Sequence, residues 1–189
     1  KIEESITAFD NAINLKPDYA EAYNSKGDTF KSQGEWGNAI DAYKKAIIVR
    51  SGYIIAYYNM GEVYIKIGKL KQAISAYEKA ILFKPNFFQA YNQMGNSLLV
   101  IGDLDKAICA YRKALLIKPD FVEALNNLGN TLLNQDKLYE AIDCYHKAIS
   151  LRPNFADSYN NLGNAFYTQG KIGKSLDAYN MALACRPKY

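Results

Sequence analysis

The chain has few of the residues on which enzyme and metal sites depend. It contains a single histidine, His146, and three cysteines that are widely separated in sequence, and it carries no glycine-rich phosphate-binding loop. Structural zinc sites use closely spaced pairs of Cys or His, and nucleophilic catalysis needs a nucleophile beside a base. The sequence therefore predicts a protein with no metal, no cofactor and no catalytic activity of its own.

Long apolar runs and basic clusters are also absent. No apolar run approaches the roughly 18–20 residues that cross a bilayer, so we expect no membrane span. The net charge of +4 is mild, and no run of Lys and Arg has interleaved aromatic residues, so we expect no nucleic-acid partner. The scattered cysteines favour free thiols in a reducing compartment, which predicts a cytoplasmic location.

The chain does have a strong period of 34 residues. All five prolines fall on one grid of this period, at Pro17, Pro85, Pro119, Pro153 and Pro187. The pentapeptide NNLGN occurs at residues 126–130 and again at 160–164. A fixed period of this length is the signature of a repeat protein. We divide the chain into a partial repeat, 1–19, followed by the repeats 20–53, 54–87, 88–121, 122–155 and 156–189.

Each repeat has the spacing of two amphipathic helices. Leu125, Leu128 and Leu132 follow the i, i+3, i+7 spacing of one helix face, and a second series begins at Leu138. The break between the two helices falls near Asp136 in this repeat, and elsewhere it carries a glycine suited to a left-handed helix end, at Gly34, Gly68, Gly102 and Gly170. NNLGN is therefore predicted to be the middle of a first helix and not a loop.

A glycine in the middle of each first helix, such as Gly129, costs about 1 kcal/mol relative to alanine. We expect such a glycine where another chain segment approaches closely. The predicted partner is the alanine at the matching place of the second helix, Ala39, Ala73, Ala107 or Ala141. Large residues such as Tyr43 and Tyr77 are then expected to fill the space between successive repeats.

Together these positions resemble the tetratricopeptide repeat (TPR) over the whole chain. The repeat 88–121 supplies the TPR pattern with Tyr91, Met94, Gly95, Leu98, Ala107, Tyr111, Ala114 and Pro119. The resemblance implies an all-α fold, a right-handed α-solenoid of helix-turn-helix repeats. Because 1–19 provides only a second helix and no polar capping helix follows 156–189, we expect a fragment of a longer protein whose bare ends self-associate or fray.

In TPR arrays the first helices line a concave groove, so the resemblance implies a scaffold that binds an extended peptide segment of a partner protein. Asparagine recurs on this face although it lowers helix propensity, and its side chain offers one acceptor and two donors that match a peptide backbone. The predicted groove residues are Asn24, Asp28, Tyr58, Asn59, Glu62, Asn92, Gln93, Asn96, Asn126, Asn127, Asn130, Asn160, Asn161 and Asn164. Asp28 and Glu62 favour a neutral to basic peptide.

Two alternatives stay open at this point. The asparagines could bond to one another and to water, tying repeat to repeat, instead of holding a ligand. The chain could also be the substrate-recruiting arm of a larger enzyme such as a glycosyltransferase. The repeats of O-linked N-acetylglucosamine transferases, and those of many bacterial TPR proteins, are similar, and the former carry an Asn two residues before the glycine, here at Asn59, Asn127 and Asn161.

Overall fold

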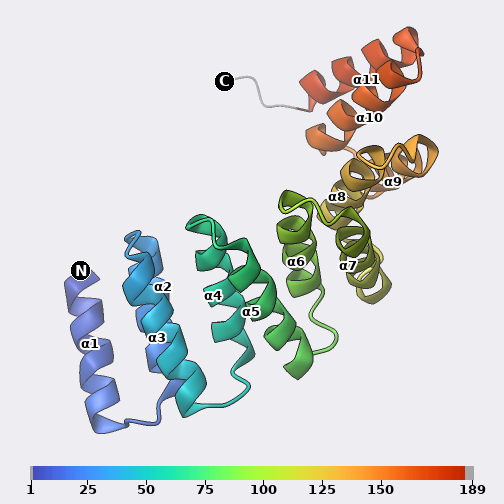
Figure 1. The fold of residues 1–189 in the computed structure, drawn as a ribbon. Coiled ribbons are helices and arrows are strands. Elements are labelled where there is room, and N and C mark those ends of the chain that lie inside the picture. Colours follow the sequence, from blue (N-terminus) through green and yellow to red (C-terminus); the bar gives the residue numbers. More distant parts are fainter. Residues whose placement is uncertain (1, 186–189) are drawn as a thin grey trace. The chain divides into compact units, whose positions relative to one another are not determined.

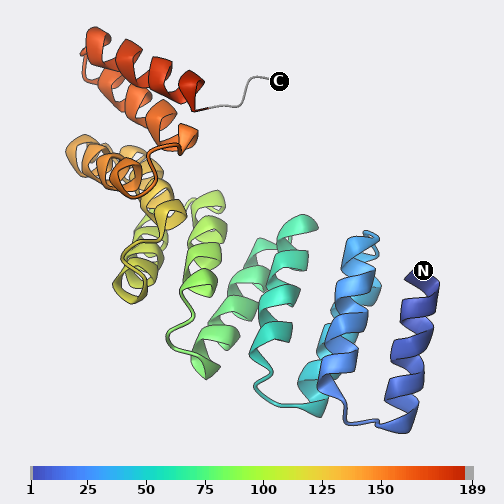
Figure 2. The same ribbon diagram turned by 180° about the vertical axis from the view of Figure 1, so that it is seen from behind.

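A computed structural model describes residues 2–185, and within them the chain is built from eleven α-helices with no strand (Figures 1 and 2). Successive helices are joined by short loops. The helices are α1 (Ile2–Leu15), α2 (Ala20–Ser32), α3 (Trp36–Val49), α4 (Ile54–Lys66), α5 (Leu70–Phe83), α6 (Phe88–Val100), α7 (Leu104–Ile117), α8 (Val122–Leu133), α9 (Leu138–Leu151), α10 (Ala156–Thr168) and α11 (Ile172–Ala184).

The chain divides into two compact units, residues 1–97 and 98–189, with the boundary inside α6. In the first unit α2 packs on α3 and α4 packs on α5, while α3 also packs on α4 and α1 on α2. In the second unit α8 packs on α9 and α10 on α11, while α7 packs on α8 and α9 on α10. Each unit is thus a series of helix pairs, and the predicted all-α architecture of tandem helix pairs is confirmed.

The turns within the helix pairs have left-handed backbone at the expected places. Gly34 and Gly68 have φ values of 75° and 74°, which glycine adopts without steric cost. Asp136 has a φ of 59° and is the only residue other than glycine with a positive φ in the described part of the chain. Aspartate tolerates this conformation better than most residues. The turn of the repeat 122–155 therefore keeps its backbone shape although its glycine is missing.

The glycine in the middle of the first helix lies against a tyrosine ring, which the sequence did not predict as its neighbour. The predicted neighbour, the small residue at the matching place of the second helix, is also in contact in the repeat 156–189, where the Ser175 hydroxyl donates to the Gly163 carbonyl at 2.9 Å. A Cβ atom added to Gly27 would lie 2.5 Å from Cε1 of Tyr43, and one added to Gly129 would lie 2.5 Å from Cε1 of Tyr145. In both cases the three nearest atoms belong to the tyrosine ring. Glycine is needed because the aromatic ring, and not a second backbone, fills the space next to it.

The same tyrosines also reach the next helix pair. Tyr43 belongs to a buried cluster with Ala39 and Ala46 of its own helix and with Ala56 and Val63 of α4. Each of these residues is fully buried. The tyrosine therefore packs both within its own repeat and against the following one, in agreement with the packing expected between successive repeats.

Candidate functional site

The predicted groove residues all lie on the helices α2, α4, α6, α8 and α10, and both copies of NNLGN are helical as predicted. Their exposure differs widely. Only 7–9% of the surface of four of them is exposed, namely Asn24, Asn59, Asn92 and Asn126. Asn160 and Asn164 are exposed, and the remaining eight are partly buried: Asp28, Tyr58, Glu62, Gln93, Asn96, Asn127, Asn130 and Asn161.

Some of these asparagines join neighbouring repeats to each other. In the second unit Nδ2 of Asn161 donates to Oδ1 of Asn126 at 3.0 Å, and the Ser158 hydroxyl donates to the same oxygen at 3.0 Å. In the first unit Nδ2 of Asn59 donates to Oδ1 of Asn24 at 3.3 Å. These bonds connect α10 to α8 and α4 to α2, so at these positions the asparagines have the structural role that was left open above.

The residue that follows the glycine of the first helix accepts a hydrogen bond from the tyrosine of the second helix. The pairs are Tyr43 with Asp28 (2.7 Å), Tyr145 with Asn130 (2.7 Å) and Tyr179 with Asn164 (2.6 Å). A buried phenol needs such an acceptor, because a buried hydroxyl without a hydrogen-bond partner destabilises the folded state. These side-chain oxygens, which the sequence assigned to a ligand, hold the tyrosine in place.

Tyr77 in α5 differs from these tyrosines. Its side chain is fully buried, and its hydroxyl has no hydrogen-bond partner among residues 2–185. The residue after the glycine is here Glu62, whose Oε2 instead accepts a hydrogen bond from Nζ of Lys31 at 2.9 Å. The pKa of the Tyr77 phenol is raised, first by burial and then by the proximity of Tyr58 and the Glu62 carboxylate.

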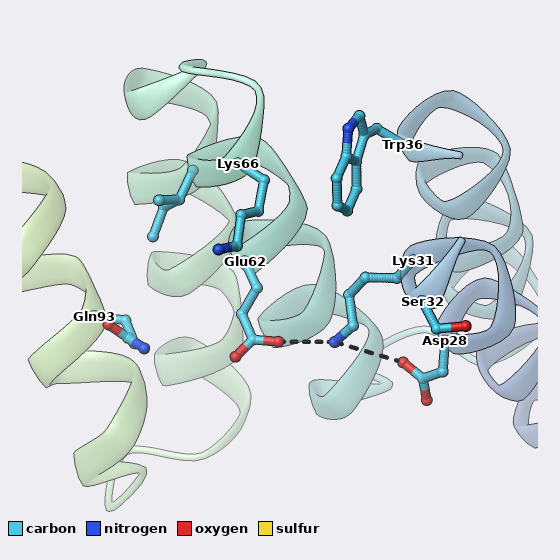
Figure 3. A pocket seen from close by; sticks show the side chains of 8 residues that line it. Asp28, Lys31, Ser32, Trp36, Glu62, Lys66 and Gln93 are labelled. Carbon is cyan, nitrogen blue, oxygen red and sulfur yellow. Dashed lines mark hydrogen bonds and ion pairs between the residues drawn. The ribbon is translucent and has the colours of Figure 1, made fainter. Parts of the chain in front are cut away.

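A cavity of about 460 Å³ lies on the first unit, where α2, the start of α3, α4 and α6 contribute side chains (Figure 3). Its lining residues are Asp28, Lys31, Ser32, Trp36, Glu62, Ile65, Lys66 and Gln93. The cavity thus brings together three of the predicted groove residues, Asp28, Glu62 and Gln93. Figure 3 shows the Lys31 side chain extending between the carboxylates of Asp28 and Glu62.

Asp28 is held by uncharged donors. Its Oδ1 accepts from the Tyr43 hydroxyl at 2.7 Å and from Nδ2 of Asn59 at 2.9 Å, and its Oδ2 accepts from Nδ2 of Asn24 at 3.0 Å. Nζ of Lys31 lies 3.8 Å from Oδ1, farther than from Glu62. Burial, followed by the hydrogen bond to Asp28, raises the pKa of Tyr43. The Asp28 carboxylate is therefore fixed by the fold.

Tyr58 lies close to Glu62 and Gln93. It stands where four other repeats have asparagine, three residues before the glycine. Burial and the Glu62 carboxylate raise the pKa of Tyr58. Lys66 is exposed at the same cavity, and its ammonium has no ion pair or hydrogen bond in the described part of the chain.

Three lining residues were not predicted from the sequence, namely Lys31, Trp36 and Lys66. A signal for the lysines existed, because Lys31 lies three residues after Asp28 and Lys66 four residues after Glu62, spacings that place side chains on one helix face. The two lysines balance the two carboxylates. The preference for neutral to basic peptides was predicted from the two carboxylates alone. The cavity also has the positive charges of the two lysines, which that prediction left out.

The described part of the chain offers neither a metal site nor a membrane span. Among residues 2–185, no three His, Cys, Asp or Glu side chains are grouped so that they could hold a metal ion. No helix in the same range is long and apolar enough to cross a membrane.

Comparison with protein families places the chain among known repeats. A family described as "TPR repeat" matches residues 1–34, 27–68, 95–136 and 129–170. Two families described as "Tetratricopeptide repeat" match residues 54–87 and 156–189, and residues 76–108. The chain therefore belongs to the tetratricopeptide repeat family. A search of curated proteins found no match.

Solved structures share the fold over most of the chain. MamA is 26% identical with a TM-score of 0.79, covering 84% of this chain and 93% of its own. YrrB, described as a TPR protein with an unusual peptide-binding site, is 25% identical with a TM-score of 0.78, covering 96% and 94%. MamA from Desulfovibrio magneticus RS-1, at 19% identity and a TM-score of 0.81 with 88% and 94% covered, shows the fold alone. These likenesses confirm the predicted fold class, an α-solenoid of tandem TPR units.

Proposed function

We propose that the first unit binds an extended segment of a partner protein, with the cavity beside Trp36 as its main contact. The cavity itself carries this proposal, because it combines the apolar side chains of Trp36 and Ile65 with a small set of fixed polar groups. Concave sites of this composition are typical of ligand binding. YrrB, which has the same fold, is described as having a peptide-binding site, which supports the proposal by analogy.

The burial of the asparagines decides which side chains would contact the peptide. The side-chain amides of Asn24 and Asn59 form hydrogen bonds with each other and with Asp28. We therefore assign them to holding Asp28 in place at the cavity and not to contacting a ligand. Trp36 offers a large and rigid contact surface of the kind that dominates binding energy in interfaces. Within the second unit, the exposed Asn160 is the proposed peptide contact, since the side-chain oxygen of Asn164 already accepts from Tyr179.

Trp36 makes a direct test available, because it is the only tryptophan of the chain. Dodecamer peptides would be selected on the chain from a random display library. Synthetic copies without tryptophan would then be titrated while the Trp36 emission is recorded. We expect a saturable change in the emission, and we expect Trp36→Ala to weaken binding of fluorescently labelled peptide by about tenfold or more.

The matched control is Tyr139→Ala, which removes an aromatic side chain that is 75% exposed on α9, outside the cavity. This variant should bind the peptides as the parent chain does. The proposal is wrong if the selected peptides bind the Trp36→Ala variant with unchanged affinity, or if the selection yields no peptide whose binding changes the Trp36 emission.

A further inference from the structure

A second cavity, of about 470 Å³, lies in the second unit. Its lining residues belong to α7, except for Lys137, which is the N-cap residue of α9. Both α7 and α9 are second helices of their repeats, so this cavity has no lining residue in common with the cavity beside Trp36 or with the predicted groove. The second unit thus has a cavity of its own, on the face of its second helices.

The charges at this cavity are mainly positive. The charged residues that line it are Arg112, Lys113, Lys137 and Asp105. Nη2 of Arg112 lies 3.1 Å from Oε2 of Glu140, and Oδ1 of Asp105 accepts from Nε2 of Gln135 at 2.8 Å. The ammonium groups of Lys113 and Lys137 have no ion pair or hydrogen bond among residues 2–185. Two cations are therefore left for an anionic group of a ligand.

Apolar side chains lie beside these cations. Leu116 is 75% exposed, although it is a large aliphatic residue, and the buried Ile108 also lines the cavity. Cys109, whose side chain behaves as a small apolar group, is exposed at the same place. The cavity thus combines apolar contact surface with a few polar groups, which is the usual composition of a binding site.

The other repeats do not have this combination. Cys109 stands where three other repeats have an aspartate, at Asp41, Asp143 and Asp177. One repeat further along the chain, Lys113 and Lys137 correspond to Lys147 and Lys171, but Cys109 and Leu116 correspond to Asp143 and Ser150. The repeat 88–121 has therefore lost a carboxylate and kept an exposed aliphatic residue next to the two lysines.

We propose that this cavity binds a segment of a second partner protein in which acidic side chains are next to an aliphatic one. The acidic side chains pair with Lys113 and Lys137, and the aliphatic side chain packs on Leu116. Complementary charges of this kind favour the correct partner and speed its association. The proposal goes beyond the function proposed for the first unit, because it gives the same chain a second partner on different residues.

The native thiol of Cys109 reports on this cavity. Cys109 is exposed, whereas Cys144 and Cys185 are partly buried. Burial raises the pKa of the Cys144 thiol to about 11, and the thiol form reacts slowly with alkylating agents because the thiolate is the nucleophile. Cys185 lies outside the cavity and serves as an internal reference. A ligand in the cavity should therefore slow the alkylation of Cys109 alone.

The test screens dodecamer peptides from a random display library on the full chain. Alkylation by N-ethylmaleimide is followed at each cysteine by mass spectrometry of tryptic fragments. We expect a group of peptides to slow the reaction of Cys109 about tenfold when present at about ten times their Kd, with Cys185 unchanged. These peptides should contain Asp or Glu next to Leu, Ile or Val. Replacing their acidic residues by Asn or Gln should weaken binding about fivefold or more.

The lysines are tested with a matched pair of double variants. Lys113→Gln with Lys137→Gln should weaken the acidic peptides about fivefold or more, and should reduce the effect of added salt on their binding. Lys147→Gln with Lys171→Gln makes the same charge change one repeat later in the same unit, and should leave their affinity unchanged.

The aliphatic contact has its own matched pair. Leu116→Ser should weaken the peptides about threefold or more, because an apolar contact is lost. Leu82→Ser changes the equivalent residue of α5, which is 66% exposed, and should have no effect on these peptides. Both leucines are largely exposed, so both variants should unfold at the same urea concentration as the parent chain.

The two proposals fail in different ways. The second partner site is overturned if no peptide protects Cys109, if the protecting peptides bind the Lys113 and Lys137 double variant normally, or if only phosphatidylglycerol vesicles give protection. None of these results affects peptides that change the Trp36 emission. Conversely, peptides that protect Cys109 without changing that emission support the second site even if the cavity beside Trp36 binds nothing.

Discussion

The repeat 54–87 of the first unit and the repeats 122–155 and 156–189 of the second unit have the same packing but different polar contacts. In the second unit Tyr145 and Tyr179 each donate to an asparagine. In the first unit Tyr77 is buried to the same extent as Tyr145 and has no acceptor among the described residues. The comparison shows that the packing of the tyrosine on the glycine is kept even without a hydrogen bond to the tyrosine hydroxyl. The residue after the glycine is therefore not required to accept that bond.

The largest expected effect tests the packing that the two regions share. Gly129→Ala should lower the free energy of unfolding by about 2–3 kcal/mol, because its Cβ would overlap the Tyr145 ring, which a hydrogen bond holds in place. Gly61→Ala should cost less, because the Tyr77 hydroxyl is not held and the ring can move. Urea unfolding followed by circular dichroism measures both changes.

The control for this pair is Gly37→Ala in α3, where an added Cβ meets nothing within 4 Å. It should stabilise the chain by up to about 1 kcal/mol through helix propensity. A Gly129→Ala variant as stable as Gly37→Ala would show that the tyrosine contact does not require glycine.

The next effect concerns the asparagine bonds between repeats. Asn126→Ala should cost about 2 kcal/mol, because it removes the acceptor of Asn161 and leaves the fully buried Ser158 hydroxyl unpaired. Asn24→Ala should cost about 1 kcal/mol, because Asn59 keeps its bond to Asp28. Hydrogen exchange of the α10 amides should increase in the first variant.

For these two variants, Asn160→Ala is the control, since this exposed asparagine has no described hydrogen bond and its loss should change stability little. Equal losses in all three variants would contradict a structural role for the buried asparagines.

The smallest effect separates the two regions most directly. Tyr145→Phe should cost about 1 kcal/mol, because it removes the bond to Asn130. Tyr77→Phe should be neutral or slightly stabilising, because it removes a buried hydroxyl that has no partner. Thermal and urea unfolding of the two variants, measured side by side, checks the difference. Equal losses would mean that the Tyr77 hydroxyl is bonded in solution.

Much of the fold could be predicted from the sequence, because the 34-residue period places the same kind of residue at the same position of every repeat. The helix pairs, the turn at Asp136 and the helical state of NNLGN were predicted from residue spacing alone. The Tyr145 ring beside Gly129 was not predicted, because spacing along one helix does not say which residue of the facing helix is nearest. Alanine and tyrosine both recur with the same period.

The site was harder to predict, because the face that binds a ligand and the face that meets the next repeat are both polar. Asn24 and Asn160 occupy the same place in their repeats, yet Asn24 is buried and Asn160 is exposed. The difference arises because Asn59 of α4 bonds to Asn24, whereas nothing among the described residues does so for Asn160. Burial here depends on the neighbouring repeat, which a single repeat sequence does not contain.

The asparagine bonds also restrict the order in which repeats can be joined. Asn24 pairs with Asn59, and Asn126 with Asn161, whereas Tyr58 lies close to Gln93. In each case the side chain three residues before one glycine meets the side chain two residues before the next. If the repeat 54–87 were deleted, Asn24 would face Gln93 and would lose the hydrogen bond that it accepts from Asn59. Two positions per repeat thus specify which repeat can follow which, and a shortened or reshuffled array would have to preserve these pairs.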